Sequence, residues 1–207
     1  MFWYKEDVAA SLSRLKDWSG DPQPVLFYGS SSFRLWESVE EDMTPWPILN
    51  VAFGGSTMAA CAWYFSQLIE PAPSRALVLY AGDNDLGDGR HPEEVINQFQ
   101  LIAIRWRELR PSQPLFFVSI KPSPVRENIL KSILYTNERI SAWCASRPGC
   151  TYIDIATPML TDGKPNAQWF EADQLHLNRL GYQLWSPILK AALAKRLGGE
   201  PAGIPPR

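Results

Sequence analysis

The stretch Val25-Leu-Phe-Tyr-Gly-Ser-Ser-Ser-Phe-Arg-Leu-Trp36 joins an apolar run to a turn rich in hydroxyl groups. Its first four residues are uninterrupted apolar side chains, which is typical of a strand buried on both faces of a parallel sheet. Gly29 then permits a sharp turn because it has no Cβ. A strand, a tight turn and a helix start present one side chain beside free backbone N–H groups. The stretch therefore predicts either a serine nucleophile or a phosphate-binding loop.

The composition outside this stretch is that of a globular protein. The chain has 207 residues, of which 45% are hydrophobic and 20% charged, and a chain of this length can bury roughly 70% of its unfolded surface in one domain. We predict a single domain over residues 1–197, with a helix at residues 2–18 packed on it. Residues 198–207 are rich in Gly and Pro and are predicted to form a tail.

Charge and hydropathy limit the partners of the chain. The net charge is −2 and no run of Lys or Arg exceeds two residues, which argues against a nucleic-acid partner. The sequence contains no stretch of about 18 uninterrupted apolar residues, so we expect no membrane span. Charges at positions 5 to 7 stand where a signal peptide would have its apolar core, so we expect a cytoplasmic protein. The sequence leaves the oligomeric state open.

Cysteine and histidine are both scarce. Cys61, Cys144 and Cys150 are too few for a disulfide framework, so we expect buried free thiols. The two histidines, His91 and His176, are far apart and no CxxC pair occurs, which argues against a zinc site. We therefore expect no metal.

The order of the predicted elements indicates the fold class. Five apolar runs predict strands, at residues 25–28, 48–53, 76–81, 115–120 and 151–155. Helical patterns lie between them, and this alternation predicts an α/β fold with a parallel sheet covered on both faces. In such sheets a ligand lies outside the carboxyl ends of the strands. Four polar clusters are predicted to meet at this edge: Ser30–Ser32, Gly54-Gly55, Gly82–Asp85 and Asp173–His176.

A serine hydroxyl becomes a nucleophile only when a base accepts its proton, and histidine is the usual base. His176 has Asp173 three residues before it, close enough on a turn to orient the imidazole. His91 precedes Pro92 and is predicted to lie at a helix start. His176 is therefore the candidate base.

Ester hydrolysis also needs hydrogen-bond donors for the oxygen that becomes negative. The backbone N–H of the nucleophile, the N–H of Gly55 and the side-chain amide of Asn84 could supply three donors. Each has a simpler interpretation, since Gly54-Gly55 can be an ordinary turn and Asn84 can bond its own backbone. Because a serine and a histidine are predicted at the same edge, we favour the functional interpretation of both Gly55 and Asn84.

These residues resemble the SGNH, or GDSL-like, hydrolase superfamily. Four sequence blocks occur in the family order, and the resemblance covers roughly residues 24–197. The blocks are Phe27-Tyr-Gly-Ser-Ser-Ser-Phe-Arg-Leu-Trp36, Asn50-Val-Ala-Phe-Gly-Gly-Ser56, Ala81-Gly-Asp-Asn-Asp-Leu86 and Asp173-Gln-Leu-His-Leu-Asn-Arg-Leu-Gly-Tyr182.

The resemblance assigns a role to each named residue. The nucleophile is Ser31, with Ser30 in place of the family's aspartate, and Trp36 at its position favours Ser31 over its neighbours. The resemblance also implies that Asp173 and His176 are the catalytic partners of Ser31. It implies that the oxyanion donors are Ser31 N–H, Gly55 and Asn84. It also implies a flavodoxin-like three-layer α/β/α fold with a five-stranded parallel sheet, no metal or organic cofactor, and hydrolysis of acyl or acetyl esters.

The substrate is less well defined by the sequence. Short loops favour a short acyl or acetyl group on a sugar, an aryl alcohol or a small alcohol, and lysophospholipid or thioester substrates are alternatives. A different class of function is a flavodoxin-like module that binds a phosphate or flavin at the Gly29–Ser32 turn. That alternative gives Asp173, His176 and Asn84 no task.

Four side chains are candidates for substrate contact: Ser30, Arg90, Lys121 and Trp169. Arg90 lies in a turn crowded with Asp83, Asp85 and Asp88, and these charges either pair at a solvated loop or let Arg90 close the pocket. The segment from Lys121 to Arg126 follows the fourth strand and could line the site. Trp169 could wall the pocket or pack in the core.

Overall fold

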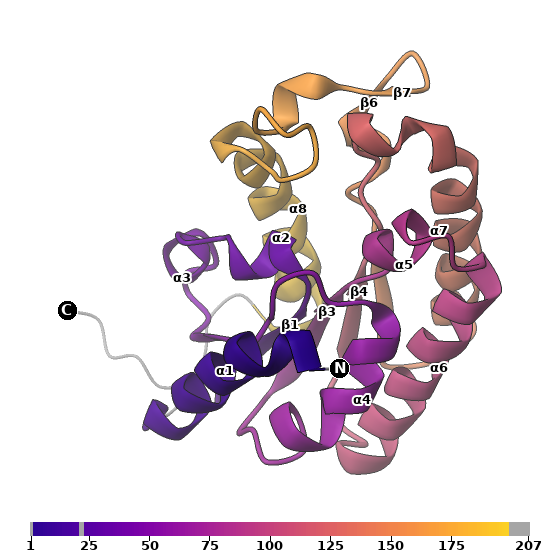
Figure 1. Ribbon diagram of the computed structural model, residues 1–207. Coiled ribbons are helices and arrows are strands. Elements are labelled where there is room, and N and C mark those ends of the chain that lie inside the picture. Colours follow the sequence, from indigo (N-terminus) through magenta and orange to yellow (C-terminus); the bar gives the residue numbers. More distant parts are fainter. Residues whose placement is uncertain (1, 21–22, 199–207) are drawn as a thin grey trace.

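The computed structural model describes residues 2–20 and 23–198, and a parallel sheet lies at its centre (Figure 1). The five strands are β1 (Val25–Gly29), β2 (Ile48–Asn50), β3 (Ala76–Tyr80), β4 (Leu115–Val118) and β5 (Cys150–Ile153). Every neighbouring pair is parallel, and the strand order is β2-β1-β3-β4-β5. This confirms the predicted α/β fold with a five-stranded parallel sheet.

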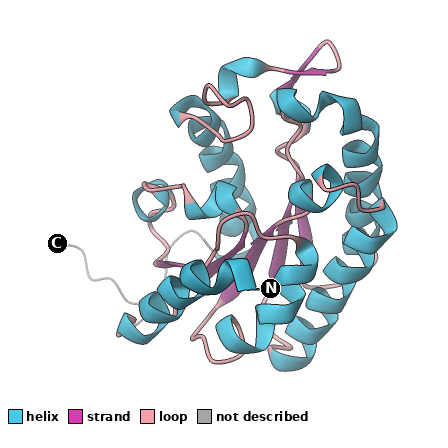
Figure 2. Cartoon of the chain, in the orientation of Figure 1, coloured by secondary structure: helices cyan, strands magenta, loops and turns pink. Residues whose placement is uncertain are grey.

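Helices cover both faces of the sheet (Figure 2). The longer ones are α1 (Lys5–Asp17), α4 (Met58–Leu68), α6 (Pro92–Leu109), α7 (Leu130–Ala145) and α8 (Arg179–Leu197). The short helix η1 (Phe2–Tyr4) precedes α1. Other short helices lie in the connections: α2 (Ser31–Arg34), α3 (Val39–Asp42), α5 (Asp83–Gly87), η2 (Pro124–Ile129), η3 (Thr157–Met159) and η4 (Ala167–Trp169). Helices α1, α4, α6 and α7 contribute to one core cluster, and α2, α3 and α8 to the other.

Alternate residues of each strand enter the two cores. In β1, Leu26 and Tyr28 pack in the first cluster, whereas Val25 and Phe27 pack in the second. All five residues of β1 and of β3 are buried, which explains why these strands are apolar without alternation. The result is the three-layer α/β/α arrangement expected from the sequence.

Several details differ from the sequence-based expectation. Strand β2 ends at Asn50 rather than at residue 53, although Val51 N–H and Phe53 N–H still donate to Phe27 O and Gly29 O of β1. A small antiparallel hairpin, β6 (Leu160–Thr161) with β7 (Lys164–Pro165), stands in the segment predicted as loop. The N-terminal helix begins with the short helix η1 and contacts α4 and β2.

The predicted tail at 198–207 lies outside the described residues except for Gly198, which ends α8. The cysteines are free thiols, with Cys61 and Cys144 buried and Cys150 partly exposed. A helix with the length and apolarity needed to span a bilayer does not occur within residues 2–20 and 23–198.

Candidate active site

Ser31 stands at the carboxyl edge of the sheet, immediately after β1. Gly29 has φ +140°, and a Cβ there would collide with the carbonyl oxygen of Tyr80 on β3. The N–H of Ser30 donates to that carbonyl at 2.9 Å, so the turn is fixed to its neighbouring strand. As the first residue of α2, Ser31 has a backbone N–H without an acceptor inside the helix.

The side chains of Ser31, His176 and Asp173 form a continuous hydrogen-bonded chain. His176 Nε2 lies 3.2 Å from Ser31 Oγ, and His176 Nδ1 lies 2.6 Å from Asp173 Oδ2. A carboxylate on Nδ1 favours the tautomer that leaves Nε2 free to accept the serine proton. The structure therefore brings together the three residues that the sequence placed in two distant blocks.

Asp173 is held in place by backbone groups of its own turn. Its Oδ1 accepts the N–H groups of Leu175 and His176, each at 2.9 Å. Its limited burial raises the pKa of Asp173, but those two N–H groups and the His176 ring outweigh this and lower the pKa to about 2. Asp173 therefore stays ionised under ordinary conditions and can stabilise an imidazolium.

The backbone of the His176 segment is clamped on both sides. The N–H of Glu171 donates to His176 O at 2.8 Å, and the side-chain amide of Asn178 donates to Gln168 O and Phe170 O, both at 2.9 Å. Asn178 also caps α8, since its Oδ1 accepts the N–H of Gly181. One asparagine thus ties the histidine segment to the last helix.

The glycine turn after β2 is anchored by the N-terminal helices. Asp7 Oδ2 accepts the Gly54 N–H at 2.8 Å, and the Tyr4 hydroxyl donates to Gly55 O at 3.1 Å. Gly55 has φ +65° and is exposed, so its backbone is accessible at the turn. Nothing in the sequence marked Asp7 and Tyr4 as supports of this turn, because they lie about 50 residues away.

Asn84 also faces this turn. Its side-chain Nδ2 donates to Ser56 O at 3.1 Å, and its Oδ1 accepts from Arg126 Nη2 at 3.1 Å. The side-chain amide of Asn84 therefore bonds two other segments of the chain rather than its own backbone. The structure brings the Gly55 turn and Asn84 together through Ser56.

A buried charge cluster lies beside Asn84. Lys121 Nζ is 2.6 Å from Asp83 Oδ2 and 3.2 Å from the Tyr80 hydroxyl, and Arg126 Nη1 is 3.7 Å from the same carboxylate oxygen. Burial raises the pKa of Asp83, but Lys121 and Arg126 outweigh it and hold the pKa below its ordinary value. Burial lowers the pKa of Lys121, and Asp83 outweighs this, so that pKa is raised.

Two predicted substrate contacts need correction. Lys121 is 1% exposed and paired with Asp83, so its side chain is unavailable to a substrate. Ser30 is also 1% exposed and Ser32 is fully buried. Only the middle serine of the three is placed beside His176. Such an arrangement argues against the phosphate-binding alternative, in which several of these hydroxyls would face the ligand.

The acidic turn after β3 is also not the solvated loop considered from the sequence, since Asp83 and Asp85 are 3% and 4% exposed. Asp85 accepts the Met58 N–H at the start of α4, at 2.8 and 3.0 Å. Burial raises the pKa of Asp85 to about 6. Arg90 points outward from the same region and lies 3.6 Å from Glu94.

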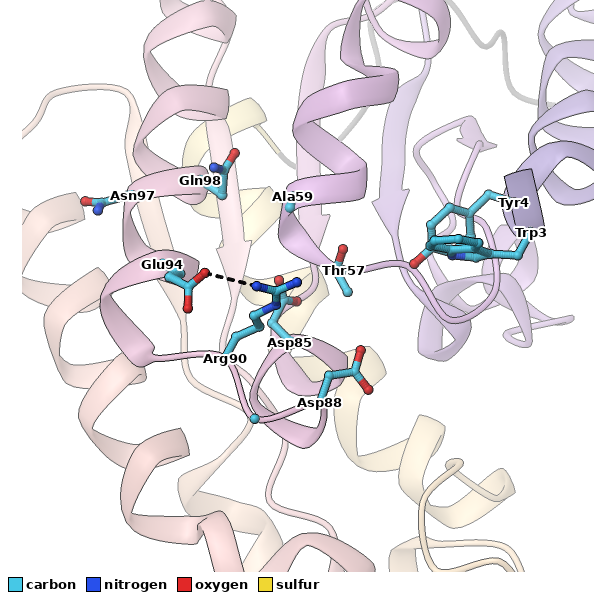
Figure 3. A pocket seen from close by; sticks show the side chains of 11 residues that line it. Trp3, Tyr4, Thr57, Ala59, Asp85, Asp88, Arg90, Glu94, Asn97 and Gln98 are labelled. Atoms are coloured by element: carbon cyan, nitrogen blue, oxygen red, sulfur yellow. Dashed lines mark ion pairs between the residues drawn. The ribbon is translucent and has the colours of Figure 1, made fainter. Parts of the chain in front are cut away.

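Arg90 lines a cavity of about 840 Å³ at this edge of the sheet. Figure 3 shows Asp85, Arg90 and Thr57 on one side of it, with Trp3 and Tyr4 on the other. The predicted contact of Arg90 with substrate stays a prediction. Trp169 is half-buried and packs against the second core cluster, as in the packing alternative.

His176 borders a second cavity, of about 660 Å³, on the side of α3 and α8. Its lining includes four carboxylates, from Glu37, Glu41, Asp42 and Glu171. Among the described residues, no group of three or more His, Cys, Asp or Glu side chains could hold a metal ion.

A five-stranded parallel sheet between helical layers, with these turns at its carboxyl edge, defines the SGNH hydrolase class of structures. The chain belongs to the GDSL-like lipase/acylhydrolase family, whose family model matches residues 19–184. This is a family of ester hydrolases.

Similar proteins agree with this placement. Platelet-activating factor acetylhydrolase IB subunit alpha1 of Bos taurus is 25% identical over 183 residues, which cover 84% of this chain and 75% of that protein. Among solved structures, a GDSL-like lipase from Bacteroides thetaiotaomicron has a TM-score of 0.78 at 18% identity, with 93% and 97% of the two chains covered. A carbohydrate esterase family 3 protein from Talaromyces cellulolyticus has a TM-score of 0.68 at 14% identity, with 84% and 97% covered. These two structures support the fold.

Proposed function

We propose that this acylhydrolase is a serine esterase that works through an acyl-enzyme on Ser31. The observation that carries the proposal is the 3.2 Å distance from Ser31 Oγ to His176 Nε2, with Asp173 on the other ring nitrogen. A hydroxyl in hydrogen-bond contact with an oriented imidazole is an activated nucleophile.

In the first half-reaction, Ser31 Oγ attacks the ester carbonyl while His176 Nε2 takes the hydroxyl proton. The carbonyl oxygen becomes negative in the tetrahedral intermediate, and three donors bind it: Ser31 N–H, Gly55 N–H and Asn84 Nδ2. His176 then gives its proton to the departing alcohol oxygen, and the acyl group remains on Ser31. Asp173 stabilises the transient imidazolium and does not take its proton.

In the second half-reaction, His176 removes a proton from water, and the resulting oxygen nucleophile attacks the acyl carbonyl. The same donors bind the second oxyanion, and Ser31 leaves with the proton from His176. Preorganised donors of this kind are worth on the order of 10²–10³ in rate each.

We propose a short acyl group, such as acetyl, on a sugar, an aryl alcohol or a small alcohol. The two cavities at the carboxyl edge are lined mainly by polar side chains. Polar side chains of this kind can form hydrogen bonds with a sugar or another small alcohol. The name of the Bos taurus relative, an acetylhydrolase, also favours a small acyl group.

The test is turnover of p-nitrophenyl esters of rising chain length by the wild-type chain and by Ser31→Ala. We expect turnover of the acetate ester, a steep fall beyond the butyrate ester, and loss of turnover in the variant. Wild-type rates in Ser31→Ala would refute the nucleophile, whereas a maximum with long chains would favour a lipid or thioester substrate instead.

A further inference from the structure

Arg126 reaches the proposed oxyanion site from a segment that has no other part in the chemistry. It lies in η2, after β4, and its side chain is 16% exposed. Its Nη2 donates to Asn84 Oδ1 at 3.1 Å, across 42 positions of sequence. The guanidinium therefore joins the connection after β4 to the connection after β3.

The two partners of Asn84 leave its amide only one orientation. An arginine side chain can only donate hydrogen bonds, and the carbonyl of Ser56 can only accept them. Oδ1 of Asn84 must therefore face Arg126, and Nδ2 must face Ser56 O. The amide nitrogen has two hydrogens, of which the Ser56 carbonyl takes one. The other hydrogen is left for a substrate oxygen. A flipped amide would present its oxygen to the oxyanion and repel it.

The charges around Arg126 add to this effect. Asp83 is shared by Lys121 at 2.6 Å and by Arg126 at 3.7 Å, so two cations share one carboxylate. Charge-assisted donation to Oδ1 polarises the amide and strengthens the N–H on its other end.

The fold makes room for the guanidinium at Gly87, the last residue of α5. A Cβ at this position would lie 2.6 Å from Cζ of Arg126. Gly87 therefore allows the guanidinium to lie against the helix that carries Asn84. This gives an independent way to displace Arg126 without removing its charge.

We propose that Arg126 is a positioning residue that fixes the Asn84 amide as an oxyanion donor. The inference rests on the proposed function, because it assumes that Asn84 binds the oxyanion. It extends that function, because Arg126 acts through Asn84 and touches no reacting atom.

The test is a double-mutant cycle with p-nitrophenyl acetate as the probe. We expect Asn84→Ala to lower kcat about 10²-fold and Arg126→Met to lower it about tenfold, with little change in KM. In the Asn84→Ala background, Arg126→Met should cause no further loss. Arg126→Lys should recover part of the kcat, because the ammonium keeps the positive charge and can donate to Asn84 Oδ1. Arg105→Met is the matched control and should keep wild-type rates, because Arg105 lies on α6 and pairs with Glu70, just after the end of α4.

Thermal unfolding of each variant separates misfolding from mispositioning. If Arg126→Met does not fold, Gly87→Ala replaces it, and a fall in kcat that disappears in the Asn84→Ala background is again the expected result. Full additivity of the two substitutions, or an unchanged kcat in Arg126→Met, would overturn the role of Arg126. An unchanged kcat in Asn84→Ala would instead refute the oxyanion assignment in the proposed function.

Discussion

Nε2 of His176 lies 3.2 Å from Oγ of Ser31, although the two residues are 145 positions apart in the chain. The parallel sheet explains this contact, because it places the carboxyl ends of its strands at one edge. Ser31 follows β1 directly, and His176 lies two residues before the N-cap of α8, which packs on the same side as α2. Tyr182 of α8 donates to Ser32 O at 3.0 Å and ties the two elements together.

The first prediction concerns which serine reacts. A fluorophosphonate probe should label Ser31 alone, because Ser30 and Ser32 are buried and only Ser31 contacts the imidazole. Peptide mapping by mass spectrometry would locate the adduct. Ser31→Ala should abolish labelling, and Ser30→Ala should retain it. An adduct on either neighbouring serine would show that the turn opens differently in solution.

The second prediction concerns the carboxylate that orients the base. Asp173→Asn should lower kcat on the order of 10⁴-fold, because an amide on Nδ1 no longer favours the needed tautomer or stabilises the imidazolium. The pKa of Asp173 is lowered from 3.8 to about 2. The contribution of its carboxylate to stability is therefore complete above the unfolded pKa near 3.8 and is lost as the pH falls through 2.

The pH profile of kcat checks this assignment. In the wild-type chain, protonation of Asp173 should cause no loss of activity between pH 5 and pH 3, because its pKa is about 2. In Asp173→Asn, kcat should be lower than the wild-type value at every pH. Wild-type kcat in that variant would mean that the backbone alone holds His176 in place.

Much of the fold and of the site could be predicted from local sequence. The uninterrupted apolar runs of β1 and β3 predict buried parallel strands, and the turns after them carry the polar residues that meet at the edge. Both histidines have an aspartate three residues earlier, but His91 precedes Pro92 and is predicted to lie at a helix start, so His176 could be chosen as the base. These signals are short-range and survive without an alignment.

The remaining features depend on contacts between distant segments, which local patterns do not encode. Lys121 was predicted to contact substrate at the end of β4, but it is buried and paired with Asp83 of the neighbouring connection. Asp7 supports Gly54 from the N-terminal helix for a similar reason. Lys121 and Asp83 meet because β3 and β4 are neighbours in the sheet, and the sequence did not predict the order of the strands.

The third prediction compares two glycines with positive φ. Gly29→Ala should destabilise the fold by about 3 kcal/mol or more. The new methyl group would collide with the backbone carbonyl of Tyr80, and alanine is also disfavoured at φ +140°. Gly89→Ala is the control, with φ +82° and open space around its Cβ, and should cost about 1–2 kcal/mol. Urea unfolding measures both. Equal costs would mean that the contact with Tyr80 relaxes freely.

The fourth prediction concerns Asp85, whose pKa burial raises from 3.8 to about 6. A raised carboxyl pKa means that the folded state binds the proton more tightly than the unfolded chain. Its contribution to stability is therefore complete below about pH 4 and is lost as the pH rises through 6. A shift of about two units corresponds to a loss of about 3 kcal/mol over this range.

Asp85→Asn removes this pH dependence while keeping an oxygen that can accept the Met58 N–H. We expect the variant to gain stability over the wild-type chain between pH 4.5 and pH 7.5, measured by urea unfolding at each pH. Asp88→Asn changes the same charge at an exposed position of the same turn and should follow the wild-type curve. Parallel curves for the wild-type chain and Asp85→Asn would mean that water or a local movement solvates this carboxylate in the folded state.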